Sequence, residues 1–270
     1  MNSKLIMIFI VFSQFIWADS FRLVTYNILS DDYIVNGLYD HVNEEILKWQ
    51  NRRDKIVERI KNLDPDVICL QELNTTSFAY FKEALEDFEG SFAKKGSSSN
   101  DGVGTFCKKE AFKETRHKAV LCEGTSNCGC AATQPALFTN LLLKNDKVIT
   151  LVNTKIKWSK DKTPSGPQWN HVQFILKSIP QTATVVVGDF NMESEHPFMH
   201  NFYSAGLQDR FPNTYSCYAN KNFQKIDYIL STNDLQNIPF ESASLSEAQP
   251  LPNENEPSDH LPVGSVITYE

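Results

Sequence analysis

An acid and an amide stand at the end of an apolar segment of strand length at residues 184–188. They are Asp189 and Asn191, two positions apart, and an extended backbone directs such a pair to the same face. Together they could hold a water molecule or a phosphate oxygen. Taken alone, Asp-Phe-Asn also fits an ordinary turn after a strand, so other residues must decide between the two interpretations.

Polar residues also occupy the ends of three other apolar segments, which lie far apart in the sequence. They are Asn27 after residues 21–26, Glu72 after residues 67–71, and the pair Asp259 and His260 ahead of residues 263–269. Each of these side chains can bind a metal ion or move a proton. The joint pattern therefore favours a catalytic centre over a set of unrelated turns.

The acids and the amide indicate a site for a divalent cation. Glu72 and Asp259 offer hard oxygen ligands of the kind that Mg²⁺ or Mn²⁺ prefers, and Asn27 offers a neutral amide oxygen. Cleavage of a phosphodiester requires that phosphoryl charge be neutralised, that a water be activated and that the leaving oxygen be stabilised. A cation held by these three residues would meet the first requirement.

Five short blocks follow one another in an order that resembles the endonuclease/exonuclease/phosphatase superfamily. They are Thr-Tyr-Asn-Ile-Leu at 25–29, Leu-Gln-Glu at 70–72, Gly-Asp-Phe-Asn at 188–191, Lys-Ile-Asp-Tyr-Ile at 225–229 and Ser-Asp-His at 258–260. That superfamily includes abasic-site endonucleases, pancreatic-type deoxyribonuclease, neutral sphingomyelinases and deadenylases. Blocks at 49–53 and 101–106 are similar to the deadenylase, nocturnin and Angel group in particular.

The resemblance implies a role for each remaining polar residue of the blocks. Asp227 would orient His260, so that one imidazole nitrogen binds the carboxylate and the other contacts the phosphate. Asp189 would orient or deprotonate the attacking water, or serve the leaving group. Asn191 would hold an oxygen in place.

Lys155 departs from this pattern, because the deadenylase-like block at residues 152–155 has histidine at that position. A lysine ammonium can stabilise phosphoryl charge, but it titrates far above neutrality and is poorly matched to proton transfer there. We therefore expect Lys155 in the site, with activity that is shifted in pH, reduced or lost.

The hydrophobic periodicity predicts how these residues are positioned. Helices are expected at residues 43–63, 78–88 and 169–179, and further strands at 103–107, 137–143 and 148–154, the last two joined by a hairpin turn at 144–146. This order suits a mixed, largely antiparallel α/β (α+β) core better than a purely parallel sheet. The resemblance implies a four-layer α/β-β/α sandwich: two packed mixed sheets with helices on their outer faces.

The N-terminus has the features of a secretory signal peptide. One lysine precedes a short apolar stretch at residues 5–12, and Ala18 is a suitable cleavage point. The stretch is shorter than the roughly 20 apolar residues that a membrane-spanning helix needs. We expect a signal peptide at residues 1–18, one catalytic domain at residues 19–270, and a secreted product.

The net charge of −7 argues against a surface that binds polyanions over its whole extent. An RNA or other phosphodiester substrate must then be bound locally, by metal ions and a few basic side chains. Lysines at 155, 157, 160 and 162 surround Trp158 and form one such candidate patch, although a run of this kind is often a solvated loop.

The cysteines bear on the oxidising environment that secretion implies. Cys69 lies within an apolar strand and is expected to be a buried small side chain. Cys122, Cys128 and Cys130 favour a loop-stapling disulfide over a zinc site, since no histidine falls at zinc-finger spacing.

Two segments are expected to lie at the surface. Asn74 begins a glycosylation motif, and residues 247–257 are expected to form an exposed loop.

The leading hypothesis is a secreted, Mg²⁺-dependent phosphodiesterase or nuclease, acting on single-stranded RNA by likeness to the deadenylase group. A sphingomyelinase-like lipid phosphodiesterase is a second hypothesis, although the sequence shows no hydrophobic hairpin or basic amphipathic helix for docking to a membrane. The third is a catalytically impaired secreted binding protein on the same scaffold, which Lys155 alone supports.

Overall fold

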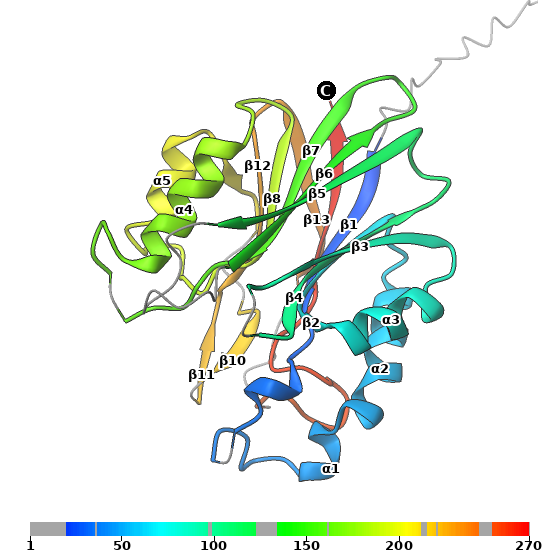
Figure 1. Cartoon of the computed structure of the whole chain (residues 1–270), viewed down its shortest axis with the longest axis vertical. Helices are drawn as coiled ribbons and strands as arrows, with labels where there is room; N and C mark the ends of the chain where they lie inside the picture. Colours follow the sequence, from blue (N-terminus) through cyan, green and yellow to red (C-terminus); the bar gives the residue numbers. More distant parts are fainter. Residues whose placement is uncertain are drawn as a thin grey trace, which may run out of the picture.

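Two six-stranded mixed sheets pack face to face in the computed structural model of the chain (Figure 1). The structure describes residues 20–35, 37–96, 99–122, 134–160, 162–211, 215–219, 221–242 and 250–269. The first sheet contains, in order, β13 (Leu235–Ser242), β14 (Val263–Tyr269), β1 (Ser20–Asn27), β2 (Val67–Asn74), β4 (Asp101–Lys108) and β3 (Phe88–Lys94). The second contains β5 (Glu114–Cys122), β6 (Gln134–Leu142), β7 (Val148–Lys155), β8 (Thr184–Asp189), β12 (Asp227–Ser231) and β9 (Gln208–Asp209).

Each sheet has one parallel pair of neighbouring strands, and this pairing brings the predicted site residues to a common edge. In the first sheet β1 runs parallel to β2, with Asn27 opposite Gln71. In the second sheet β7 runs parallel to β8, with Lys155 opposite Asp189. The antiparallel strand β12 begins at the same edge, because Asp227 lies opposite Asp189.

The central strands are buried on both faces, which explains their nearly continuous apolar sequences. In β2, Val67 and Cys69 point into the core between the two sheets, whereas Ile68 and Leu70 pack against the helices outside. Alternation along an extended strand produces this division. The expectation that Cys69 is a buried small side chain is confirmed.

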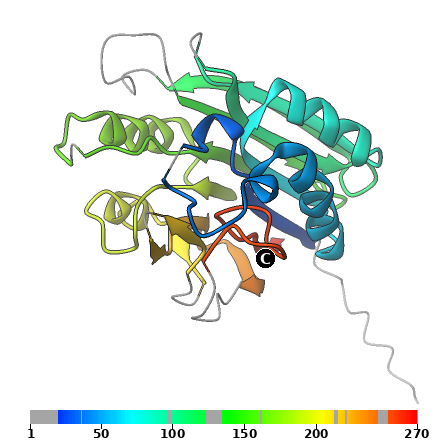
Figure 2. The same ribbon diagram turned by 90° about the horizontal axis from the view of Figure 1, so that it is seen from below.

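Helices cover the outer face of each sheet, as a four-layer sandwich requires (Figures 1 and 2). The first sheet is covered by α2 (Trp49–Asn62) and α3 (Thr75–Ala84), and the second by α4 (Pro167–Ser178) and α5 (Met199–Ser204). A short α1 (Glu44–Leu47), a 3₁₀ turn (Asp31–Tyr33) and a hairpin of β10 (Cys217–Ala219) and β11 (Asn222–Gln224) complete the elements. The predicted fold class is therefore confirmed.

The helix expected at residues 43–63 is interrupted at Lys48, whose backbone is extended (φ −63°, ψ 132°). The cause is Arg52, which is 1 % exposed and must satisfy its guanidinium within the protein. Its Nε donates to Leu47 O at 2.7 Å and its Nη2 donates to Leu29 O at 2.9 Å. The end of α1 therefore supplies a carbonyl to a buried cation instead of continuing the helix.

The helix expected at residues 78–88 begins and ends earlier than predicted. Asn74 accepts a hydrogen bond from the N–H of Ser77 at 2.8 Å and caps α3 at its first turn. The helix ends at Ala84, and Phe88 already begins β3. The cap shows that Asn74 turns the chain away directly after Glu72; its glycosylation stays a prediction.

One further expectation needs correction, and two others concern residues outside the described part of the chain. The loop expected at 247–257 is not exposed throughout: Leu251 and Pro257 are buried, and His41 Nε2 lies 3.0 Å from Leu251 O. Cys128, Cys130 and the signal peptide at 1–18 are not among the described residues. The disulfide and secretion stay predictions.

Candidate active site

The predicted site residues meet at the common edge of the two sheets. Ion pairs, hydrogen bonds or electrostatic interactions link each one to at least one other member of the group. They are Asn27, Glu72, Lys155, Asp189, Asn191, Asp227, Asp259 and His260. Residues from β1, β2, β7, β8, β12 and the segment before β14 thus form one buried polar cluster.

Asn27 is the centre of this cluster. Its Nδ2 donates to Glu72 Oε1 at 2.9 Å and to Asp189 Oδ2 at 3.1 Å, and it lies 3.3 Å from His260 Nε2. Its Oδ1 accepts the N–H of Leu29 at 3.0 Å, which fixes the orientation of the amide. Asn27 therefore faces the site as a donor, and the oxygen expected to bind a metal is turned toward its own backbone.

Glu72 lies at an irregularity of β2, where the pairing register with β4 shifts and φ is 63°. Such left-handed backbone is costly outside glycine and re-aims a side chain at the end of a strand. Ser30 N donates to Oε2 at 2.7 Å, and Lys155 Nζ binds Oε1. Burial acts to raise the pKa of Glu72, but Lys155, Asn27 and Ser30 outweigh it and the pKa is lowered.

Of the lysines of the proposed patch, Lys155 binds residues of the site. Its Nζ pairs with Glu72, lies 3.9 Å from Asp189 Oδ2 and sits 4.5 Å from the centre of the Tyr33 ring. Burial opposes the ammonium, but the charges of Glu72 and Asp189 prevail and raise the pKa of Lys155. The lysine is a permanent positive charge between two carboxylates.

Asn191, two residues after Asp189, holds the Asp189 carboxylate in place. Asn191 donates its backbone N–H to Asp189 Oδ1 at 2.9 Å and its Nδ2 to Oδ2 at 3.3 Å. The backbone of Asn191 is left-handed (φ 52°), so a tight turn, not strand alternation, brings the two together. Burial raises the pKa of Asp189 to about 6, despite the nearby charges of His260 and Lys155.

His260 is oriented by Asp227 as the resemblance implies. Its Nδ1 lies 2.8 Å from Asp227 Oδ2, which also accepts the hydroxyl of Ser216 at 2.7 Å. Burial disfavours the imidazolium, but Asp227 outweighs this effect and raises the pKa of His260 well above its ordinary value. Nε2 is directed into the site, 4.0 Å from Asp189 Oδ2.

Asp259 has a partner that the sequence did not indicate. Tyr39, from the loop before α1, donates its hydroxyl to Asp259 Oδ2 at 2.7 Å. Burial raises the pKa of Asp259; His260 acts against this rise, and the charge of Glu72 adds to it. Glu72 and Asp259 are therefore two buried carboxylates whose charges repel, an oxygen donor set that fits Mg²⁺ or Mn²⁺.

A second polar network supports the site from beneath, between the two sheets. Gln71 donates to Asn153 Oδ1 at 2.9 Å, and Asn153 donates to Gly104 O at 2.8 Å. Gln71 directly precedes Glu72, and Asn153 lies two residues before Lys155. These bonds tie the first sheet to the second and so fix the distance between the strand ends that carry the site.

Two hollows lie beside a residue of the site or beside a partner of one. One, of about 370 Å³, is lined by Asn191, Gln168, His196 and the exposed Trp158. The other, of about 620 Å³, is lined by Tyr39 and by apolar side chains of the segment before α2. The first hollow therefore contains a residue of the site, and the second contains the partner of Asp259.

Known proteins are similar in sequence to most of this chain. Protein angel of Drosophila melanogaster is 25% identical over 291 residues, which cover 93% of this chain and 81% of that protein. The CCR4-Not complex 3'-5'-exoribonuclease subunit Ccr4 of Candida glabrata is 24% identical over 315 residues, covering 90% of this chain but 36% of that protein. The chain thus spans about a third of this Ccr4 relative.

A solved structure shares the fold over nearly its whole length. The crystal structure of ANGEL2, a 2',3'-cyclic phosphatase, in complex with adenosine-2',3'-vanadate has a TM-score of 0.83 and 19% sequence identity, covering 94% of this chain and 97% of that one. The profile of the Endonuclease/Exonuclease/phosphatase family matches residues 24–260, which include all eight predicted site residues. The chain belongs to the endonuclease/exonuclease/phosphatase family.

Proposed function

We propose that this chain is a metal-dependent phosphodiesterase that hydrolyses single-stranded RNA. The observation that carries the proposal is the position of Asp189 and His260. Their side chains lie 4.0 Å apart on either side of the Asn27 amide, one with a pKa near neutrality and the other held in its charged form by Asp227. A base and a cation at this separation can act on one phosphodiester together.

Each residue of the cluster has a chemical part in that reaction. Asp189 takes the proton of the attacking water, because its raised pKa of about 6 makes it a suitable base near neutral pH. His260 Nε2 donates to a phosphoryl oxygen, and Lys155 adds a fixed positive charge. Glu72 and Asp259 would hold Mg²⁺ or Mn²⁺, which supplies further neutralisation of phosphoryl charge.

RNA is favoured as substrate by the activity for which a relative is named and by the hollow beside Asn191. The Ccr4 relative is named as a 3'-5'-exoribonuclease. In this chain Trp158 is 56% exposed at that hollow, and an exposed aromatic ring can stack on an unpaired base. The net charge of −7 fits a protein that binds its substrate only near the site, through metal ions and a few basic side chains.

Hydrolysis of a 2',3'-cyclic phosphate is a second candidate, favoured by Lys155. A cyclic phosphodiester is strained. Its ring therefore opens with less need for a residue that donates a proton to the leaving oxygen. Lys155, paired with Glu72, is a poor proton donor near neutrality. The structural likeness to ANGEL2, described as a 2',3'-cyclic phosphatase, agrees with this candidate.

The lipid alternative finds less support in the molecule. Large exposed hydrophobic side chains of the described residues lie on separate elements, for example Leu121 on β5, Val148 on β7 and Ile238 on β13. They do not form one hairpin that could enter a bilayer. No helix in the described part of the chain is long and apolar enough to span a membrane.

The proposal is tested with a substrate panel and a matched pair of variants. The panel contains poly(A), mixed single-stranded RNA, DNA, a nucleoside 2',3'-cyclic phosphate and sphingomyelin, each with Mg²⁺, Mn²⁺ or a chelator. Glu72→Gln should abolish turnover of RNA, whereas Glu58→Gln, on the exposed face of α2, should leave it unchanged. Turnover of sphingomyelin alone would refute the proposal.

A further inference from the structure

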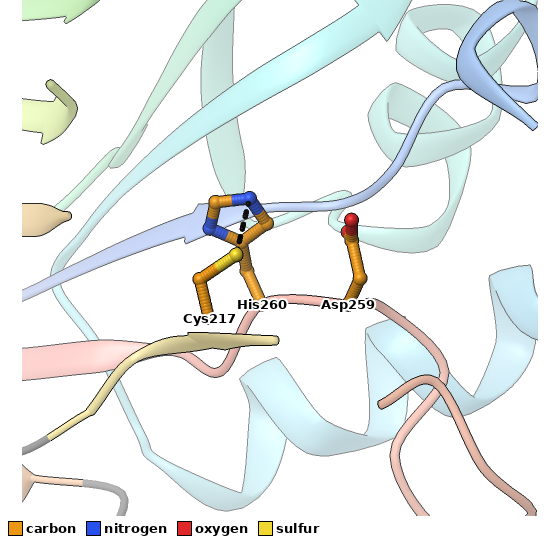
Figure 3. Close-up of side chains that lie close together, drawn as sticks. All are labelled: Cys217, Asp259 and His260. Atoms are coloured by element: carbon orange, nitrogen blue, oxygen red, sulfur yellow. Dashed lines mark hydrogen bonds between the residues drawn. The ribbon is translucent and has the colours of Figure 1, made fainter. Parts of the chain in front are cut away.

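A thiol lies beside the two site residues that end the Ser-Asp-His block. Cys217 is fully buried at the start of β10, and its Sγ lies 3.5 Å from His260 Nε2 (Figure 3). One ligand atom from each of Cys217, Asp259 and His260 lies within 4.8 Å of the other two. The hydrolysis proposed above uses Asp259 and His260, but it has no use for a thiol.

Backbone pairing holds the three side chains together. Cys217 and His260 form an isolated antiparallel bridge, flanked by Tyr218 N to Asp259 O at 2.8 Å and Leu261 N to Ser216 O at 2.7 Å. The thiol, the imidazole and the carboxylate stand on the same side of these paired segments (Figure 3). Their proximity is therefore a property of the backbone and does not depend on one flexible side chain.

We propose that Cys217, His260 and Asp259 form a binding site for Zn²⁺ that inhibits the enzyme. Zinc bonds of about 2.3 Å to sulfur and about 2.0 Å to nitrogen, at a tetrahedral angle, place the two ligand atoms about 3.5 Å apart. The Cys217 to His260 separation matches this value without any movement. Asp259 supplies the third ligand and a water completes the tetrahedron.

The surroundings of His260 and Asp259 are those of metal ligands. His260 binds Asp227 through Nδ1, which leaves Nε2 as the coordinating atom, and Ser216 holds Asp227 in turn. Tyr39 holds Asp259 through Oδ2. Zinc binds a thiolate and a neutral imidazole, so it must displace both the thiol proton of Cys217 and the Nε2 proton of the charged His260 when it binds.

This site discriminates between metals through its sulfur. A thiolate is a soft ligand that suits Zn²⁺, whereas Mg²⁺ prefers oxygen and would gain little from Cys217. Zinc at this position takes His260 Nε2 and Asp259, so it removes the imidazole from the phosphate. The inhibition rests on the proposed function, but the binding of zinc does not.

Calorimetric titration of the metal-free protein with Zn²⁺ tests binding independently of activity. Cys217→Ser should weaken Zn²⁺ affinity about 100-fold or more, since even outer partners of metal ligands are worth 10–100-fold. The control is Cys69→Ser, the same replacement at a second buried cysteine, whose Sγ lies near the hydroxyl group of Thr105. It should leave the Zn²⁺ affinity unchanged. Co²⁺ should give sulfur-to-metal charge-transfer absorption in the native protein and in Cys69→Ser, but not in Cys217→Ser.

Equal Zn²⁺ affinity in the native protein and in Cys217→Ser would overturn the site. With a phosphodiester substrate and Mg²⁺ in excess, zinc should inhibit the native protein at concentrations that spare Cys217→Ser. Inhibition of both proteins alike would overturn the regulatory part. If zinc binds through Cys217 but the native protein hydrolyses no substrate of the panel, the zinc site stands and the proposed function fails.

Discussion

Lys155, which is 18% exposed, forms an ion pair with the buried Glu72 at the edge where the two sheets meet. The ammonium lies where the negative charge of the site is most concentrated, with Asp189 Oδ2 at 3.9 Å. Lys155 thus neutralises part of the charge that a divalent cation would otherwise neutralise, and it competes with the cation for Glu72. This pairing decides how the site responds to metal and to pH.

The replacement Lys155→His should raise the rate of phosphodiester hydrolysis near neutral pH. An imidazole titrates near neutrality and can transfer a proton, an effect worth roughly 10² to 10⁴ in rate where it operates. It also frees Glu72, so the affinity for Mg²⁺ should rise. Kinetics over a range of pH, with calorimetric Mg²⁺ titration, measures both effects. A loss of activity together with unchanged Mg²⁺ affinity would show that the ammonium itself binds substrate.

Glu72→Ala and Glu72→Gln should both abolish metal-dependent turnover but differ in stability. Removing the carboxylate leaves the partly buried Lys155 with only Asp189 Oδ2, at 3.9 Å, as a charged partner, so the cost should lie below the roughly 3 to 5 kcal/mol of a fully buried pair. Glutamine keeps one oxygen, which can accept from either Ser30 N or Lys155, so it should lose less stability than alanine does. Thermal melts of the two variants make the comparison. Equal melting temperatures would argue against the ion pair.

Asp227→Asn should destabilise the fold in a manner that depends on pH. The folded pKa of His260 is raised, so the stabilisation from its charged form is complete below the ordinary histidine pKa and is lost as pH rises through the folded value. The loss should be about 3 kcal/mol near pH 6 and smaller near pH 10. Denaturant unfolding of both proteins at each pH gives the difference. A difference that is constant with pH would contradict this account of His260.

Secretion should be accompanied by cleavage near Ala18. The basis is the short apolar stretch at residues 5–12 and the start of β1 at Ser20. N-terminal sequencing of protein collected from the medium of a eukaryotic host identifies the cleaved bond. A product that retains Met1 and stays with the membrane fraction would disprove this expectation.

The sequence predicts this fold well where strands are buried on both faces. The strands β2 and β8 contain the continuous apolar runs Val67–Leu70 and Val185–Val187, and each run leads to an acidic residue of the site. In contrast, β5 is mostly exposed and carries Glu114, Arg116 and Lys118, so no apolar pattern reveals it. The break at Lys48 was not predictable from periodicity, because it depends on the distant carbonyls that Arg52 binds.

The sequence predicts the members of the site better than their orientations. The blocks identify Asn27 and Asp189, but the donor role of the Asn27 amide depends on the N–H of Leu29. Tyr39 and Cys217 carry no local signal, because each reaches the site through tertiary contacts of a loop or a short strand. Such contacts become visible only when the distant segments are placed side by side.

Hydrolysis of a single-stranded RNA oligonucleotide in Mg²⁺ by the native protein and by Asp189→Asn tests the central claim most directly. Asparagine keeps the shape and one oxygen of Asp189 but cannot accept the proton of the attacking water. The role of Asp189 as base predicts that the native rate falls below about pH 6 and that the variant loses roughly 10² to 10⁴ in rate while remaining folded. A folded Asp189→Asn protein that hydrolyses the RNA within a few-fold of the native rate would contradict it.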